Sequence, residues 1–138
     1  MNIPTTTYVW KSKKSDKYFY TGITSRFIEK RLKEPIRDNP HFKSREDIEL
    51  LFERIFLDKE QALSCEAGFI HYFKVLTKHN LIYCLNKNNN KYNSYITKPA
   101  EFTLGLNLCN KIMGQFSYLK RKINIKLKNQ LKIDIGLR

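Results

Sequence analysis

Residues Tyr8 to Glu34 read YVWKSKKSDKYFYTGITSRFIEKRLKE, and we expect the rest of the chain to pack around this stretch. It contains two short aromatic runs, Tyr8–Trp10 and Tyr18–Tyr20, which are separated by a polar and charged link. β-Branched and aromatic residues on both sides of such a link predict a β-hairpin over about residues 5–23. Gly22 lies near its end, where it is compatible with a tight turn.

A helix is predicted after the hairpin, from about Arg26, with Thr24 or Ser25 as its N-cap. It has to end before Pro35, because proline disfavours a helical backbone in the residue that precedes it. The segment that follows, residues 35–45, contains two prolines and is predicted to be a loop.

Three further elements are predicted in the middle of the chain. The apolar stretch over residues 48–57 favours a strand from about Leu51, with a helix as the alternative. Asp58, followed three residues later by a glutamine, resembles a capping box and predicts a helix that runs to about Thr77. A short last strand is predicted over residues 81–85.

The predicted middle helix carries a carboxylate, Glu66, inside its apolar stripe. The other members of that stripe are Ala62, Leu63, Phe69, Ile70 and Phe73. Burying an unpaired carboxylate is costly, so Glu66 needs a cation, a basic side chain or a polar cleft. A salt bridge with Arg31 would satisfy it structurally, and a metal ion would satisfy it functionally.

An asparagine-rich link suggests a division into a main module, residues 1–93, and an extension, residues 94–138. Within the extension, a rough helical period covers residues 102–119, and residues 120–128 alternate basic and apolar side chains, as in a strand with a cationic face. Residues 101–138 carry eight basic residues against two acidic ones, a net charge of +6. The extension is expected to contact DNA, to complete the core, or both.

The whole chain has a formal net charge of +13, from 26 Lys and Arg against 13 Asp and Glu. This excess favours a polyanionic partner, nucleic acid before an acidic membrane surface. The three cysteines lack C-x-x-C spacing and are expected to be reduced thiols of a cytoplasmic protein. No apolar run reaches the roughly 20 residues of a membrane-spanning helix, so no membrane partner is expected.

Four motifs occur in an informative order. The segment Thr6–Tyr8 is followed, after eleven intervening residues, by Tyr20–Gly22, and Ile23–Glu34 then leads into the first predicted helix. Ala62–Ile70 forms part of the later helix that contains Glu66. Together, over about residues 5–86, these motifs resemble the GIY-YIG nucleases, a family named after its first two motifs.

The resemblance implies an α/β (α+β) fold, with a small mixed or antiparallel sheet flanked by helices. It implies that Glu66 holds one divalent cation, Mg²⁺ or Mn²⁺, in each site, and that Arg31 binds the scissile phosphate. Tyr8 and Tyr20 would face one another across the hairpin and position or deprotonate the attacking water. Gly22 would allow a tight turn or a close approach of the backbone to the phosphate.

Members of the family often have an asparagine after the last strand that supports the site. Asn86 is the candidate in this chain, with Asn80 and Asn93 as alternatives. The chain departs from the family at two points. Its first motif has two threonines in place of glycine and isoleucine, and Pro35 stands where the family often has histidine or tyrosine.

We therefore predict a metal-dependent DNA endonuclease with a one-metal GIY-YIG-type mechanism, acting on double-stranded DNA in restriction, homing or mobile-element biology. The alternatives are a catalytically inactive nucleic-acid-binding protein with the same fold, and a structure-specific repair nuclease. Cutting both strands with one site requires either a homodimer or two successive binding events.

Overall fold

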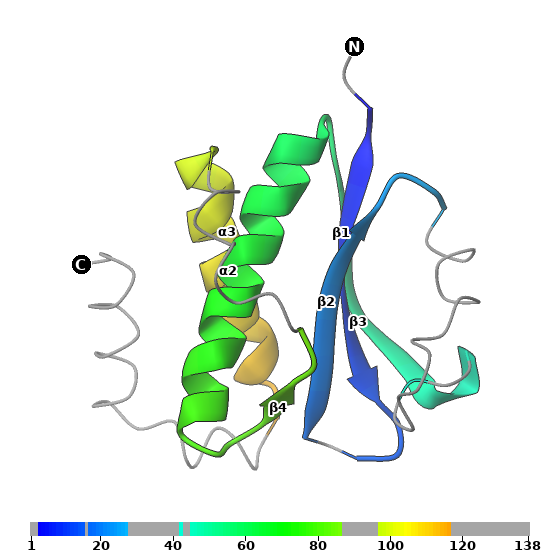
Figure 1. The fold of residues 1–138 in the computed structure, drawn as a ribbon, viewed down its shortest axis with the longest axis vertical. Helices are drawn as coiled ribbons and strands as arrows, with labels where there is room; N and C mark the ends of the chain where they lie inside the picture. Colours follow the sequence, from blue (N-terminus) through cyan, green and yellow to red (C-terminus); the bar gives the residue numbers. More distant parts are fainter. Residues whose placement is uncertain (1–2, 16, 28–41, 43–44, 87–96, 117–138) are drawn as a thin grey trace.

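The computed structural model describes residues 3–15, 17–27, 42, 45–86 and 97–116 (Figure 1). Helix α2 (Lys59–Lys78) covers one face of a four-stranded sheet, and α3 (Pro99–Met113) packs on α2. The remaining elements are β1 (Thr5–Ser12), β2 (Tyr18–Thr24), the 3₁₀ helix η1 (Arg45–Asp47), β3 (Ile48–Phe56) and β4 (Tyr83–Cys84). This arrangement confirms the predicted α+β fold class.

The sheet has the strand order β3-β1-β2-β4. β1 pairs antiparallel with β2 and with β3, while β4 pairs parallel with β2. The β1–β2 pair confirms the predicted hairpin, and β3 confirms the strand interpretation of residues 48–57 over the helical one. β3 begins at Ile48 rather than near Leu51, because Ile48 already pairs with Ser12 at the end of β1. β4 is shorter than the strand predicted over residues 81–85.

Alternation along the strands divides the aromatic side chains between the two faces of the sheet. Phe19 faces α2 and packs on Phe73, with ring centroids 5.6 Å apart. Tyr8, Trp10 and Tyr20 lie on the opposite face, which we call the tyrosine face. Trp10 and Phe19 are both fully buried, but they belong to different faces.

Helix α2 begins where the sequence predicts. The Asp58 carboxylate accepts a hydrogen bond from the Gln61 backbone N–H at 2.9 Å. The Gln61 side chain in turn accepts one from the Leu57 backbone N–H at 3.1 Å. This is a capping box whose return bond is displaced by one residue. The helix ends at Lys78, one residue beyond the predicted end.

Helices α2 and α3 approach one another at two glycines, Gly68 and Gly105. A Cβ atom on Gly105 would lie 3.1 Å from the Cys65 carbonyl carbon, and one on Gly68 would lie 2.9 Å from the Leu106 nitrogen. Both obstacles are backbone atoms, which cannot turn away as a side chain can. The close contact allows α3 to add three buried side chains to the core: Leu106, Cys109 and Met113.

Gly105→Ala is expected to destabilise the protein by about 3 kcal/mol, because the new methyl group forces the two helix backbones apart. The change can be measured by urea unfolding followed by circular dichroism. Gly114→Ala, at the exposed end of α3, is the matched control and is expected to cost less than about 1 kcal/mol. Equal unfolding curves for both variants would contradict the close contact.

The described part of the chain contains no helix with the length and apolar character needed to cross a membrane. All three cysteines are free thiols. Burial raises the pKa of the Cys65 thiol to about 12 and that of Cys109 well above its usual range. Both thiols are therefore protonated at neutral pH and pack as apolar groups.

Candidate active site

The two tyrosines predicted to act in catalysis share the tyrosine face. Tyr8 pairs with Gly22 and Tyr20 pairs with Trp10, so the tyrosines are diagonal neighbours rather than direct partners across the hairpin. Their ring centroids lie 6.3 Å apart, and the Trp10 ring lies 4.9 Å from Tyr8 and 5.5 Å from Tyr20. Tyr8 is 1% exposed and Tyr20 is half-buried, so Tyr20 is the more accessible of the two.

Gly22 is required by the position of the Tyr8 ring. A Cβ atom on Gly22 would overlap the Tyr8 hydroxyl and would lie 2.6 Å from its Cζ atom. The phenol therefore lies directly over the glycine of the neighbouring strand. Gly22 lies within β2, and the contact that requires a glycine here is the one with the Tyr8 ring. A close approach of its backbone to the phosphate stays a prediction.

Asn86 lies beside the second motif, where it is hydrogen-bonded to Thr21. Its Oδ1 accepts from the Thr21 N–H at 3.0 Å, and its Nδ2 donates to the Thr21 carbonyl at 2.7 Å. The β4 ladder reaches this point through a bond from the Leu85 N–H to the Phe19 carbonyl, 2.9 Å long. The Asn86 side chain supplies the next pair of bonds in place of backbone, and the ladder ends beside Gly22.

Asn80, one of the two alternatives to Asn86, ends helix α2. Its φ is 60°, its N–H donates to the Thr77 carbonyl at 2.9 Å, and the Leu81 N–H donates to the Leu76 carbonyl at 3.0 Å. These features form a Schellman motif, in which asparagine is a common substitute for glycine. Asn93, the other alternative, lies outside the described residues.

Two contacts define how α2 lies along β2. Near the start of α2, the Thr7 hydroxyl donates to the Ala62 carbonyl at 2.9 Å, and Thr7 pairs with Ile23 of β2. Further along the helix, Phe73 packs on Phe19 of β2. Helix α2 therefore runs antiparallel to β2 (Figure 1).

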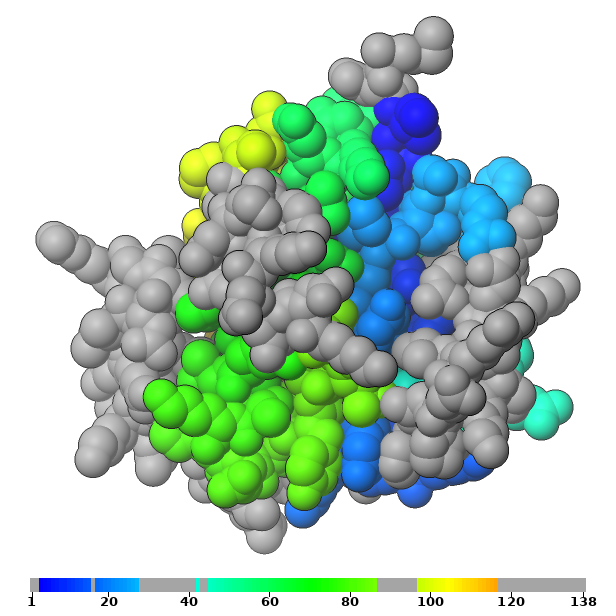
Figure 2. Space-filling view, viewed as in Figure 1, coloured from blue at the N-terminus to red at the C-terminus, as the bar shows by residue number. Residues whose placement is uncertain are grey.

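These contacts place Glu66 level with Gly22. Glu66 follows the first contact by four residues and precedes the second by seven, which correspond to about 6 and 10 Å along a helix. Residues of a strand are about 3.4 Å apart, so these distances correspond to about two residues back from Ile23 and about three residues on from Phe19. Both counts end at the segment around Gly22. Beyond the ladder of β4, β2 reaches the surface beside α2 (Figure 2). Helix α2, which carries Glu66, and the Tyr8 ring thus lie on opposite faces of the sheet at this level.

The Glu66 carboxyl group is half-buried, and burial raises its pKa from the usual 4.5 to about 7. No charged group in the described part of the chain lowers this pKa. A divalent cation beside the carboxylate would favour its ionised form. The described residues contain no cluster of three or more His, Cys, Asp or Glu side chains that could hold a metal. One carboxylate completed by waters and a phosphate oxygen fits Mg²⁺, which retains several waters when bound.

Arg31, the predicted phosphate-binding residue, lies outside the described residues, as does Pro35. The structure describes the chain that leads towards Arg31 as far as Phe27. In this segment the Thr24 hydroxyl accepts a hydrogen bond from the Arg26 N–H at 3.1 Å. The helix predicted from about Arg26 falls almost entirely on residues that are not described.

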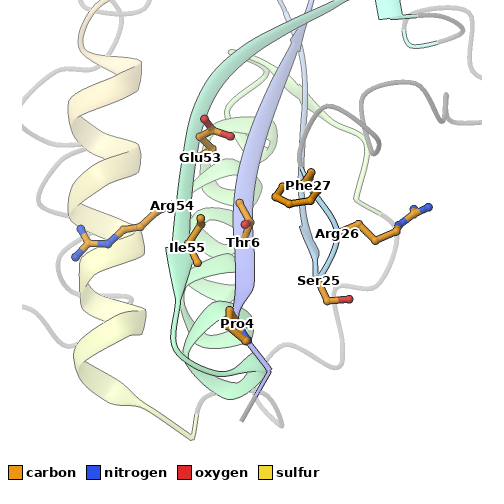
Figure 3. A pocket seen from close by; sticks show the side chains of 8 residues that line it. All are labelled: Pro4, Thr6, Ser25, Arg26, Phe27, Glu53, Arg54 and Ile55. Atoms are coloured by element: carbon orange, nitrogen blue, oxygen red, sulfur yellow. The ribbon is translucent and has the colours of Figure 1, made fainter.

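A groove of about 760 Å³ lies beside Tyr8 on the tyrosine face (Figure 3). In the β1–β3 pairing, Glu53 is opposite Tyr8 and Ile55 is opposite Thr6, so β1 and β3 contribute adjacent side chains to it. The groove was not predicted, because the mixed period of β3 does not indicate which side chains share a face. The full lining consists of Pro4, Thr6, Ser25, Arg26, Phe27, Glu53, Arg54 and Ile55.

The family profile of the GIY-YIG catalytic domain matches residues 4–80, which is more than half of the chain. The chain belongs to the GIY-YIG family. The matched range contains both tyrosines, Gly22 and Glu66, while Asn86 and α3 lie beyond it. Comparisons with curated proteins and with solved structures gave no match.

The first GIY-YIG motif of this chain has Thr6 and Thr7 at its glycine and isoleucine positions. Thr7 is fully buried, but its hydroxyl is satisfied by the Ala62 carbonyl, so the polar group costs little. Thr6 is 7% exposed and lines the groove. Tyr8 is nevertheless paired with Gly22, so the two threonines change the contacts of β1 and not the pairing of the motifs.

Proposed function

We propose that this GIY-YIG protein is a metal-dependent endonuclease that hydrolyses phosphodiester bonds in DNA. The observation that supports this most strongly is the position of Glu66 level with Gly22, where Asn86 ends the sheet. A residue of α2 whose carboxyl pKa is raised is thus level with the stretch of β2 that carries Tyr20 and that the Tyr8 ring covers. Phosphodiester hydrolysis needs a site for a cation, groups that orient water, and groups that bind the phosphate.

Each residue has a distinct role in this proposal. Glu66 would hold one Mg²⁺ or Mn²⁺ ion, which would neutralise charge on the phosphate and on the departing 3′ oxygen. Tyr20, the more accessible tyrosine, would position the attacking water. The Tyr8 phenol, which lies beside Gly22, would form a second hydrogen bond to this water. Arg31 would form charge-assisted hydrogen bonds to the scissile phosphate.

DNA is the proposed substrate because of the charge of the chain and the groove beside Tyr8. A net charge of +13 attracts a polyanion independently of its sequence. The groove is lined by Arg26 and Arg54, and its Glu53 is paired with Tyr8 across β1 and β3, so a DNA strand that reaches the tyrosines would pass along it. We further propose that residues 94–138 form an extension whose basic residues add phosphate contacts.

The proposed activity can be tested with supercoiled plasmid incubated with the purified chain, with Mg²⁺, with Mn²⁺, or with EDTA. Conversion to open-circular or linear DNA that requires the metal is the expected result. Plasmid that stays supercoiled, together with oligonucleotide duplexes, nicked duplexes and branched junctions that stay uncut, would contradict the proposal. Cleavage of the branched substrates alone would identify a structure-specific nuclease instead.

Without metal, the wild-type protein is expected to lose stability as pH rises from about 5 to about 8. The pKa of Glu66 is 4.5 when unfolded and about 7 when folded, so the folded state binds more protons in this window. Melting temperatures in EDTA should therefore fall with pH relative to those of Glu66→Gln, which has no proton to lose. Mg²⁺ at pH 8 should raise the melting temperature of the wild type and not that of the variant. Parallel pH curves for the two proteins would refute the raised pKa.

A second candidate function is nucleic-acid binding without cleavage. Tyr8, at 1% exposed, favours it, because a phenol that water cannot reach cannot activate a water molecule. Tight, salt-sensitive binding of DNA with no cleavage of any substrate would support this function.

A further inference from the structure

A chain of hydrogen bonds links α2 to both strands of the hairpin. The Lys74 ammonium donates to the Asn86 carbonyl at 2.6 Å, and the Asn86 side chain forms the two bonds to Thr21 described above. The Thr21 hydroxyl then donates to the Tyr8 carbonyl at 2.8 Å. This series of hydrogen bonds thus connects the helix that carries Glu66 to the backbone of Tyr8.

Lys74 is suited to hold a carbonyl in this position. Its side chain is half-buried, and its bond to Asn86 is short, as expected when a charged donor meets a carbonyl away from bulk water. The Cys84 thiol lies nearby: burial raises its pKa, while the Lys74 charge acts in the opposite direction. This role could not be predicted from the amino-acid sequence, since a lysine on an amphipathic helix is usually a solvated surface residue.

The side-chain amide of Asn86 is occupied by the Thr21 backbone on both of its atoms. Oδ1 accepts from the Thr21 N–H and, at 3.4 Å, from the Cys84 thiol, while Nδ2 donates to the Thr21 carbonyl. Asn86 therefore acts on the site through β2. What it controls is the position of Thr21, the residue between Tyr20 and Gly22.

We infer that Lys74 is a positioning residue for the proposed nuclease reaction, because it holds Asn86 and through it fixes β2 relative to the Glu66 helix. The inference rests on the proposed function for its catalytic consequence. Helix α2 is attached to the hairpin on both sides of Glu66: by the Thr7–Ala62 bond one turn before it and by the Lys74–Asn86 bond two turns after it. Loss of the second bond removes the hydrogen bond that follows Glu66 and leaves apolar packing, such as Phe73 on Phe19, to position that part of α2 against β2.

Amide hydrogen exchange tests the structural half of the inference without any cleavage assay. In Lys74→Met, which keeps the length of the side chain but lacks the donor, exchange of the Thr21 amide should accelerate at least tenfold. Lys74→Arg should restore protection, and Lys78→Met, at an exposed position of the same helix, is the control for loss of one charge. If Lys74→Met does not fold, Asn86→Ala should show the same loss of Thr21 protection. Unchanged Thr21 exchange in the folded variants would overturn the inference.

A double-mutant cycle tests the catalytic half. Lys74→Met and Asn86→Ala are each expected to lower the single-turnover cleavage rate at saturating DNA by 10- to 100-fold, with the DNA dissociation constant within threefold of wild type. The double variant should be no slower than the slower single variant, because Lys74 acts through Asn86. Rate effects that multiply in the double variant would show that Lys74 and Asn86 act independently. A loss of DNA affinity with a reduced salt dependence would show that Lys74 contacts the phosphates directly. Either result would overturn the inference. A wild type that cleaves nothing would refute the proposed function, while the exchange experiment would still decide the role of Lys74.

Discussion

Glu66→Gln is expected to lower metal-dependent DNA cleavage by at least about a thousandfold and to leave the DNA dissociation constant within about threefold of wild type. The amide has nearly the same shape as the carboxylate but is neutral, so it binds a divalent cation poorly while packing equally well. Glu66 lies on α2 and does not line the groove on the tyrosine face, so its loss is expected to remove no phosphate contact there. The measurement is the rate of plasmid nicking in Mg²⁺ and Mn²⁺, paired with DNA binding in Ca²⁺ or EDTA.

Glu60→Gln is the matched control, because Glu60 is an exposed carboxylate in the first turn of the same helix. It should cleave at the wild-type rate. A Glu66→Gln variant that retains more than a tenth of wild-type activity would remove Glu66 from the metal site. A variant that is folded and has lost DNA affinity would instead indicate that Glu66 organises the DNA-binding surface.

Gly22→Ala is expected to destabilise the protein by about 2–3 kcal/mol and to lower the cleavage rate by about a hundredfold. Its methyl group would overlap the ring of Tyr8, which is buried. The ring has to move, and the tyrosine pair moves with it. The melting temperature and the single-turnover rate, taken well below that temperature, separate the two effects.

The energetic coupling between Gly22 and Tyr8 provides the control for this prediction. In a Tyr8→Leu background the clash with the ring is absent, so Gly22→Ala should cost at least about 1 kcal/mol less there than in the wild type. Ile23→Val, the neighbouring change on the α2 side of the strand, should have little effect on either measurement. A Gly22→Ala variant as stable and as active as wild type would show that the phenol does not lie over the glycine.

Most of the secondary structure of the described residues could be predicted from the sequence because its local signals agree. The hairpin follows from two aromatic runs around a polar link, and α2 follows from Asp58 and a clear helical period. Glu66 could be identified because a carboxylate inside an apolar stripe breaks that period. The family resemblance then implied a metal-binding role for Glu66, which stays a prediction, while the family match to residues 4–80 confirms the family.

The relations between elements could not be predicted. Which residue pairs with Tyr20 depends on the strand register, which the turn and the packing of both faces determine. The register makes the two tyrosines diagonal neighbours on one face, with ring centroids 6.3 Å apart, rather than a direct pair. The bonds of Lys74 and Asn86 depend on how the end of β4 meets α2, and no sequence period reports this. A residue such as Lys74, which acts by positioning another residue, produces no recognisable motif in the sequence.

The glycine contact between α2 and α3 has a consequence for protein engineering. Two helices whose backbones touch cannot slide or rotate against one another, so the end of α3 at Met113 has a fixed direction relative to the tyrosine face. A module fused through a continuous helix at this point would be aimed by helix geometry, turning about 100° and advancing about 1.5 Å with each inserted residue. The proposed cleavage position of such a chimera on DNA should therefore vary periodically with linker length, with the repeat of an α-helix. A flexible tether would give a gradual change instead.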